Sequence, residues 1–330
     1  MLILAIETSC DETAAAVVCN GVEVLSNVIN SQINIHQQFG GVVPEVASRH
    51  HIENIKPVVA EALARANVAL SDINAIAVSN TPGLVGALLV GVSYAKGLAF
   101  GAGIPLIPVN HIHAHICANF IEFEDLKPPF LCLVASGGHS HIIEVKDFAE
   151  FEIIARTRDD AAGEAYDKIA RILGLGYPGG PAVSKCAETG DSDFLKLPRV
   201  KMQGSLDYSF SGVKTAVINY VHKCRQAGEE LRSADICASF QRAVNEALCQ
   251  HLIDAARERG IGTIALAGGV AANAKLRELA ERFASENGMK FYCPSLELCT
   301  DNAAMVGASG YFNFQAGIVA GLELNAVATM

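Results

Sequence analysis

The same order of predicted elements occurs twice along this chain of 330 residues. In each half, strand-length apolar segments come first, and helices alternating with strands follow. In the first half we expect strands at residues 2–6, 13–18, 22–29, 75–79 and 104–109, and helices at 44–63, 84–100 and from about 111. In the second half we expect strands at 130–135, 141–145, 151–155, 263–267 and 290–292, and helices at 233–259, 271–286 and 301–315. A repeated α/β pattern predicts two related lobes with a ligand cleft between them.

Domain boundaries follow from this repeat. We expect a first lobe at residues 1–109 and a second at 110–306, with a glycine-rich helical insertion at about 159–225. A C-terminal helix at about 307–330 is expected to pack back on the first lobe. Asn20-Gly21 predicts a hairpin turn, and Pro57 should kink or interrupt the helix that contains it.

Composition narrows the class of protein. The hydrophobic fraction of 51% can form a sizeable core, and 25 basic against 35 acidic residues give a net charge of −10. That balance argues against an autonomous nucleic-acid-binding protein. The ten cysteines contain no C-x-x-C pair, so a zinc ribbon is not expected. Because no signal peptide is recognisable, we expect the protein in the reducing cytoplasm. The apolar segment 83–95 stops at Lys96, short of the roughly 20 residues of a membrane-spanning helix, and predicts a buried helix.

Polar turns stand at equivalent points of the repeat. Residues 7–13 (ETSCDET) follow the first strand of one half, and Ser136-Gly137-Gly138-His139-Ser140 follows the first strand of the other. Such turns cradle phosphate through backbone N–H groups, or they are ordinary hairpin turns; their equivalent placement favours a ligand site. Gly268-Gly269, between a strand and a helix, fits a nucleotide or a structural turn equally well.

A histidine pair suggests a metal site. In Asn110-His111-Ile112-His113-Ala114-His115, a helix would place His111 and His115 on one face. Two ligands need a third from elsewhere, most plausibly a carboxylate; the alternative is two polar histidines at a helix start. The motif is not H-E-x-x-H. By composition, Thr300 or Asp301 is the N-cap of the last helix.

Two charged stretches remain open to more than one interpretation. Asp160, Glu164 and Asp167 would share one helix face, which is either solvated or able to bind ribose hydroxyls. The most basic stretch is either a solvated loop or a phosphate-facing surface, and its charged residues are Lys196, Arg199, Lys201 and Lys214.

Taken together, these stretches resemble the bacterial TsaD family of tRNA threonylcarbamoyladenosine-modifying proteins, formerly described as O-sialoglycoprotein endopeptidases. The matching segments span nearly the whole chain in family order: IETSCDET, SQINIHQQFGGVVPEVASRHH, PGLVGALLVG, NHIHAH, ASGGHS, DDAAGEAYDKIARILGLGYPGGP, SFSGVKT, AGGVAAN and CTDNAAM. Ser184 departs from the pattern, because part of the family has aspartate at this position.

The resemblance implies the sugar kinase–Hsp70–actin fold, with two tandem RNase H-like βββαβα lobes. It implies transfer of a threonylcarbamoyl group from threonylcarbamoyl-AMP to the N6 amine of the tRNA adenosine just 3′ of the anticodon. It further implies that His111, His115 and Asp301 bind one divalent ion, Fe2+ or Zn2+. The adenine nucleotide substrate would contact Val134, Ala135, Ser136, Gly137, Gly138, Asp167, Gly180 and Asn273.

A mechanism and a set of partners follow from that resemblance. The metal would act as a Lewis acid, the glycine turn would stabilise charge on the carbonyl oxygen, and Asp11 or Glu12 would accept the amine proton. TsaB, expected on segment 46–63 or 84–100, and the ATPase TsaE would be partners, and a separate synthase would make the threonylcarbamoyl-AMP. Because the chain is acidic, tRNA is expected on a composite surface to which the basic stretch contributes.

Three other functions remain open at this point. A metalloprotease is disfavoured by the absence of H-E-x-x-H. A nucleotide-binding scaffold without chemistry would not need the metal site. A small-molecule kinase is possible on fold alone.

Overall fold

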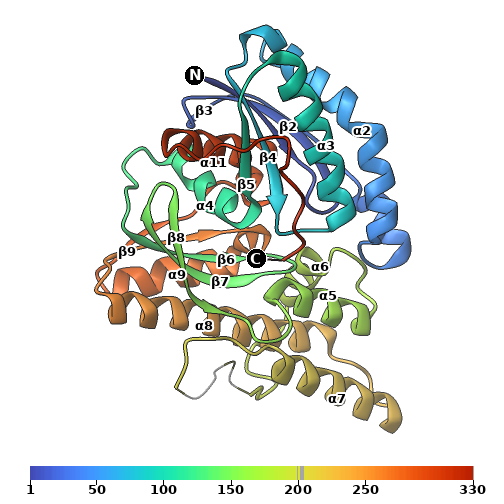
Figure 1. The fold of residues 1–330 in the computed structure, drawn as a ribbon. Helices are drawn as coiled ribbons and strands as arrows, with labels where there is room; N and C mark the ends of the chain where they lie inside the picture. Colours follow the sequence, from blue (N-terminus) through green and yellow to red (C-terminus); the bar gives the residue numbers. More distant parts are fainter. Residues whose placement is uncertain (199, 201–203, 330) are drawn as a thin grey trace. The chain divides into compact units, whose positions relative to one another are not determined.

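The computed structural model describes residues 1–198, 200 and 204–329. They form two compact units, each built on one five-stranded sheet (Figure 1). The first unit contains Met1–Pro128, Lys146–Glu150 and Pro294–Met330, and the second contains Pro129–Val145 and Phe151–Cys293. The division expected between residues 109 and 110 falls inside the first unit, because the helix that follows residue 110 packs within it.

The first sheet has the strand order β3-β2-β1-β4-β5. Strand β1 pairs antiparallel with β2 and parallel with β4. Asn20 and Gly21, with φ of 51° and 76°, make the tight turn between β2 and β3, which confirms the predicted hairpin. The strands are β1 Leu2–Glu7, β2 Glu12–Cys19, β3 Glu23–Ser31, β4 Ala75–Thr81 and β5 Leu106–Asn110.

Both faces of this sheet are covered by helices (Figure 1). Alternate residues of β1 point to opposite faces: Ile3 and Ala5 belong to the core under α4 and α11, whereas Leu4 and Ile6 belong to the core under α2 and α3. The four helices are α2 Pro44–Arg65, α3 Val85–Ala102, α4 His111–Glu122 and α11 Ala303–Gln315; the short elements are α1 Ile33–His36, η1 Gln37–Phe39, η2 Leu70–Asp72 and α10 Leu296–Cys299.

Helix α11 lies unusually close to the sheet because two of its residues lack side chains. A Cβ atom on Gly307 would lie 2.4 Å from Val18 Cγ2, and one on Gly310 would lie 2.5 Å from Ala77 Cβ. Only glycine permits this approach. The helix expected to reach residue 330 ends at Gln315, and the segment after it hydrogen-bonds along the first unit, with Ala320 N donating to Leu106 O at 2.8 Å.

The predictions for two helices of the first unit had opposite outcomes. Pro57 lies inside α2 without interrupting it; the flanking residues Ile55, Val58 and Val59 are buried against the sheet, which offsets the lost hydrogen bond. Helix α3 is long and apolar enough to cross a membrane by length and composition. Its buried residues, however, pack into the core of this unit, as predicted for segment 83–95.

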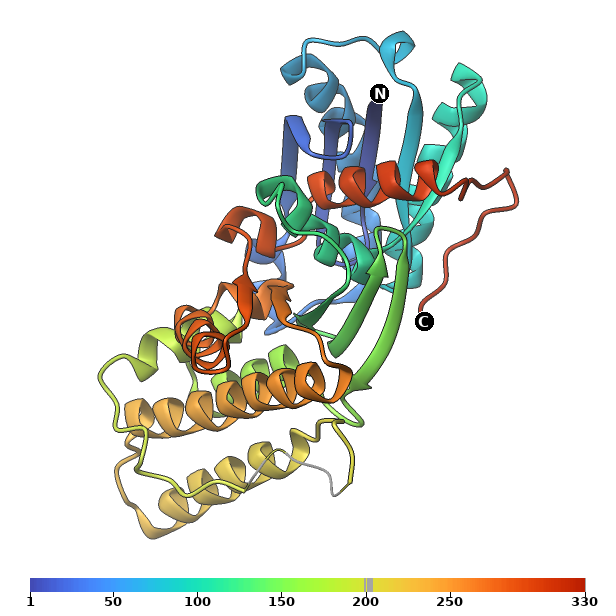
Figure 2. The same cartoon turned by 90° about the vertical axis from the view of Figure 1, so that its left-hand side faces the viewer.

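The second sheet, with order β10-β9-β6-β7-β8, repeats the first. Strand β6 takes the place of β1, since it pairs antiparallel with β7 and parallel with β9. The predicted duplication is therefore confirmed. Helices α7 and α8 lie side by side in this unit (Figure 2). Its elements are β6 Phe130–Ala135, β7 Ser140–Asp147, β8 Glu150–Arg156, α5 Ala162–Leu173, α6 Gly179–Ala187, α7 Ser211–Ala227, α8 Ser233–Arg259, β9 Thr263–Ala267, η3 Gly269–Ala272, α9 Ala274–Glu286 and β10 Lys290–Tyr292.

Candidate active site

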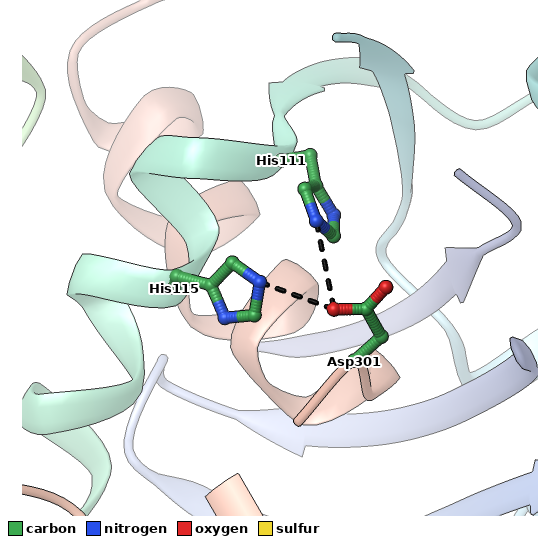
Figure 3. A group of neighbouring side chains, drawn as sticks. All are labelled: His111, His115 and Asp301. Atoms are coloured by element: carbon green, nitrogen blue, oxygen red, sulfur yellow. Dashed lines mark ion pairs between the residues drawn. The ribbon is translucent and has the colours of Figure 1, made fainter. Parts of the chain in front are cut away.

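The histidine pair sits at the start of α4, where β5 ends. The Asn110 side chain accepts hydrogen bonds from Ile112 N at 2.8 Å and His113 N at 3.2 Å, so it caps the helix. His111 and His115 are then one turn apart on the same face. Figure 3 shows both rings directed toward Asp301. The ring of His113 is not part of this group.

Asp301 reaches the pair because it does not cap the helix that follows it. The cap of α11 is Asn302, whose Oδ1 accepts a hydrogen bond from Met305 N at 3.0 Å. The composition-based assignment of Thr300 or Asp301 as the cap is therefore wrong. Asp301 Oδ1 lies 3.1 Å from His115 Nε2 and 3.6 Å from His111 Nε2.

The three residues fit a divalent cation. His115 is fully buried, and among the described residues neither of its ring nitrogens has a hydrogen-bond partner. The 3.1 Å distance between His115 Nε2 and Asp301 Oδ1 is short enough for an ion pair, but the geometry is not that of a hydrogen bond. Ligands held about 2.0–2.2 Å from one tetrahedral ion are about 3.3–3.6 Å apart, close to what is observed. Imidazole with carboxylate suits both Fe2+ and Zn2+.

Glu7 orients the first histidine from behind. Its buried Oε2 lies 3.0 Å from His111 Nδ1 and accepts a hydrogen bond from Ser79 Oγ at 2.5 Å. Ser9 Oγ also lies 3.1 Å from His111 Nδ1. A proton on Nδ1 is thereby fixed, and Nε2 is left facing Asp301, the usual arrangement behind a metal-bound histidine. The sequence placed Glu7 in the first polar turn but gave no sign of this pairing.

The surroundings carry an excess of negative charge. Burial lowers the pKa of His111, but the charges of Glu7 and Asp301 outweigh it and raise that pKa to about 9. Burial raises the pKa of Glu12 to about 9, helped by the charges of Asp301 and Asp11. Carboxylates that disfavour one another's charge in this way suit a cation. Asp11 is 7% exposed and hydrogen-bonds Glu12, so both predicted proton acceptors lie in this acidic cluster.

In the second unit the corresponding turn, residues 136–140, exposes backbone groups rather than charged side chains to a ligand. Ser136 N donates to His139 O at 2.8 Å, and His139 N donates to Ser136 Oγ at 3.2 Å. A Cβ atom on Gly137 or Gly138 would meet nothing within 4 Å, so a ligand can approach these residues closely. The preceding Val134 and Ala135 have buried side chains inside β6.

Glycines elsewhere bring neighbouring elements against this turn. A Cβ atom on Gly163 would lie 2.6 Å from Ser136 O. Gly268, with φ of +87°, would place a Cβ atom 2.5 Å from Ala135 O. The Gly268-Gly269 pair is thus explained by the close approach of η3 to β6, and the helix expected from residue 271 begins at Ala274.

The residues expected to hold a nucleoside surround α6. Asp167 Oδ1 accepts a hydrogen bond from Gly179 N at 2.7 Å and so fixes the start of that helix. A Cβ atom on Gly180 would meet nothing within 4 Å. Asn273 caps α9, with Oδ1 accepting a hydrogen bond from Leu276 N at 3.0 Å.

The charged stretches are largely paired within the chain. Lys168 Nζ lies 2.7 Å from both Asp160 and Glu164. Lys214 also pairs with Asp160, and its side chain is 18% exposed, so it is less available to phosphate. The expected acidic helix face is not formed, because Asp160 precedes α5, which begins at Ala162, and Asp167 accepts a hydrogen bond from Gly179 N. Lys196 is exposed; Arg199 and Lys201 lie outside the described residues.

Comparison with known proteins agrees with this geometry. The family model TsaD, tRNA N6-adenosine threonylcarbamoyltransferase, matches residues 23–308. The chain belongs to the TsaD family. Proteins of that printed name from Clostridium botulinum (strain Kyoto / Type A2) and Clostridium perfringens (strain ATCC 13124) are 57% and 58% identical over 326 residues, which is 98% of this chain and 96% of each relative. The chain is therefore an enzyme of the transferase class.

Solved structures show the fold. T. kodakarensis HypF has a TM-score of 0.64 at 17% identity over 96% of this chain and 48% of its own. The ROK hexokinase from Thermus thermophilus has a TM-score of 0.50 at 14% identity over 95% of this chain and 100% of its own. These likenesses confirm the predicted sugar kinase–Hsp70–actin fold.

Proposed function

We propose that this enzyme transfers the threonylcarbamoyl group of threonylcarbamoyl-AMP to the N6 amine of the adenosine just 3′ of the anticodon in tRNA. The observation that carries the proposal is the buried His111–His115–Asp301 group in a chain that matches the family over residues 23–308. The relatives' name supplies the acceptor atom and the transferred group.

The chain's own residues account for binding and proton transfer. A bound Fe2+ or Zn2+ would supply Lewis acidity at the first unit. Backbone N–H groups of Gly137 and Gly138 would stabilise charge on the carbonyl oxygen that is attacked, because the N–H of Ser136 already donates to His139 O. Asp11 and Glu12, which belong to the acidic cluster beside Asp301, are the candidate acceptors of the proton that the adenosine amine loses.

The test is a reconstituted transfer reaction read by nucleoside mass spectrometry. Unmodified tRNA, threonine, bicarbonate, ATP, the synthase, TsaB and TsaE would be supplied with the wild-type chain, His115→Ala or His113→Ala. We expect modified adenosine from the wild type and from His113→Ala, and at least about 100-fold less from His115→Ala, because a metal ligand is lost.

The other outcomes discriminate between functions. Equal product from all three chains would contradict the metal-assisted reaction. If the wild-type chain gave no product although its partners were verified to be active, the result would favour the nucleotide-binding scaffold. Metal-dependent peptide cleavage by the purified chain would favour the metalloprotease.

The partner proposal rests on an exposed apolar surface and on charge. Ile52 of α2 is 65% exposed, Leu89 of α3 is 41% exposed and Phe100 is 75% exposed. Large apolar side chains exposed on two helices that contact each other favour a protein interface, and we assign this one to TsaB. With a net charge of −10, the chain would bind tRNA together with TsaB and TsaE in the cytoplasm.

A further inference from the structure

One histidine of the first unit bridges the two ends of the acidic loop, residues 10–13 (CDET). His51 Nε2 lies 2.9 Å from Cys10 O, and His51 Nδ1 lies 2.8 Å from Thr13 Oγ1. These two partners are the first and the last residue of the loop. The imidazole ring therefore spans both acidic residues, which lie between its two contacts.

The two partners also fix where the ring carries its proton. Cys10 O can only accept a hydrogen bond, so Nε2 must be the donor. Burial lowers the pKa of His51, which keeps the ring neutral at neutral pH, and Nδ1 then accepts from the Thr13 hydroxyl. The side chain is fully buried. A ring enclosed in this way touches no substrate, so any effect on the reaction must pass through the acidic loop.

Helix α2 holds the ring at the level of this loop. His51 lies one turn after Ala47 and one turn before Ile55, so the three share a face, and all three are buried. The helix packs on β2, the strand that begins within the acidic loop. Among the described residues of α2 that are buried, His51 is the one polar side chain. Because an unpaired buried imidazole is costly, its two hydrogen bonds make it compatible with this face.

Contacts from β3 and the residue after it hold the other side of the acidic loop. Gln32 N donates to Asp11 O at 3.0 Å. Ser31 Oγ donates to Glu12 Oε1 at 2.9 Å. The loop is therefore held between two elements, and His51 provides the contacts from α2.

We propose that His51 is a positioning residue for the transfer reaction: by binding Cys10 O and the Thr13 hydroxyl, it holds the carboxylates of Asp11 and Glu12 where they accept the amine proton. Misplacing a reacting group by about 1 Å costs on the order of 100-fold in rate, so a fixed loop matters for proton transfer. The role of the two carboxylates rests on the proposed function, whereas the contacts of His51 do not.

The test compares His51→Leu, which fills the site without hydrogen bonds, with His51→Gln, whose amide can still donate to Cys10 O. Single-turnover transfer would be measured with the reconstituted complex in saturating excess over tRNA, so that an unfolded fraction of the chain does not change the rate constant. We expect the rate constant to fall about 10- to 100-fold in His51→Leu and at most about threefold in His51→Gln, with tRNA affinity unchanged in both.

Two further variants complete the design. Thr13→Val removes only the hydroxyl that donates to Nδ1 and nearly keeps the shape of the side chain, so it tests the clamp even if His51→Leu folds poorly. Its rate constant should fall about fivefold. His222→Leu makes the same change as His51→Leu at an exposed position of α7 and should leave the rate constant unchanged.

Each other outcome counts against the inference. Wild-type rate constants in both His51→Leu and Thr13→Val overturn it and leave the proposed function standing. An equal loss in His51→Leu and His51→Gln overturns it too, because the hydrogen bond to Cys10 O would then not matter. Weaker tRNA binding with an unchanged rate constant would make His51 a binding determinant instead. A wild-type complex with verified partners that gives no product overturns the inference together with the proposed function.

Discussion

The turn after the first strand is used in opposite ways in the two units, although their sheets have the same strand order. In the first unit this region carries Glu7, which pairs with His111, and Asp11 and Glu12, whose carboxylates belong to the acidic cluster with Asp301. In the second unit the equivalent turn carries Gly137 and Gly138, which present backbone to open space. One topology thus supplies charge for a cation in one unit and N–H donors for a polar ligand in the other.

The largest expected effect tests the reliance of the second unit on backbone approach. Gly268→Ala should destabilise the protein by about 3 kcal/mol, because the residue has φ of +87° and a Cβ atom would lie 2.5 Å from Ala135 O. Gly269→Ala is the matched control, since a Cβ there meets nothing within 4 Å. Urea unfolding of both variants measures the difference; equal midpoints would contradict the close approach.

Glu7→Gln tests the reliance of the first unit on charge. Removing the carboxylate behind His111 should weaken Zn2+ binding 10- to 100-fold, measured by competition with a chelating dye. Glu23→Gln, at an exposed position, provides the control. If Glu7→Gln binds the ion as tightly as wild type, the carboxylate does not orient the histidine.

Buried histidines in the two units should respond differently to acid. Burial, with a smaller contribution from the charge of Arg156, lowers the pKa of His141 in the second unit to about 4, whereas that of His111 is raised. Because His141 has a lower pKa in the folded than in the unfolded state, the folded state loses stability as the pH falls below 6.5, the pKa of an unfolded histidine. The loss of stability levels off below about pH 4, the folded pKa. At pH 5 the loss is about 2 kcal/mol relative to pH 8.

His141→Gln should therefore flatten the stability profile between pH 6.5 and pH 4, measured by urea unfolding at each pH. An unchanged slope in the variant would show that His141 does not keep its neutral form in the fold.

The smallest effect concerns the outer surface of the first unit. Leu89→Asp replaces an exposed side chain, so the chain alone should unfold at the wild-type temperature. Its association with TsaB should weaken about tenfold, measured by titration. The same substitution at Val319, which is 54% exposed in the C-terminal segment, is the control; wild-type affinity in Leu89→Asp would place the partner elsewhere.

Features set by local patterning could be predicted from the sequence. Strand-length apolar segments predicted the strands of both sheets, and the bounds expected for the helix at 233–259 and the strand at 263–267 are those of α8 and β9. The spacing of His111 and His115 placed them on one helix face. Asp301, the third member of the candidate metal site, was expected there only from the family resemblance, because it is distant in sequence.

Long-range contacts account for what was missed. Glu7 meets Ser79 and His111 across 72 and 104 residues, and no local pattern encodes such pairs. The choice of Asn302 as cap over Thr300 or Asp301 depends on tertiary packing, since all three residue types are suitable for capping or nearly so.

The docking of α11 on the first sheet has a consequence for biosynthesis. A ribosome that has completed residues 1–293 has already made the ten strands that the described residues form, yet the candidate cation site still lacks Asp301. The Asp301 carboxylate can join the two histidines only after α11 packs, through Gly307 and Gly310, on strands that were translated earlier. Metal uptake would then mark the end of folding, and a prematurely terminated chain could not acquire the ion with all three ligands.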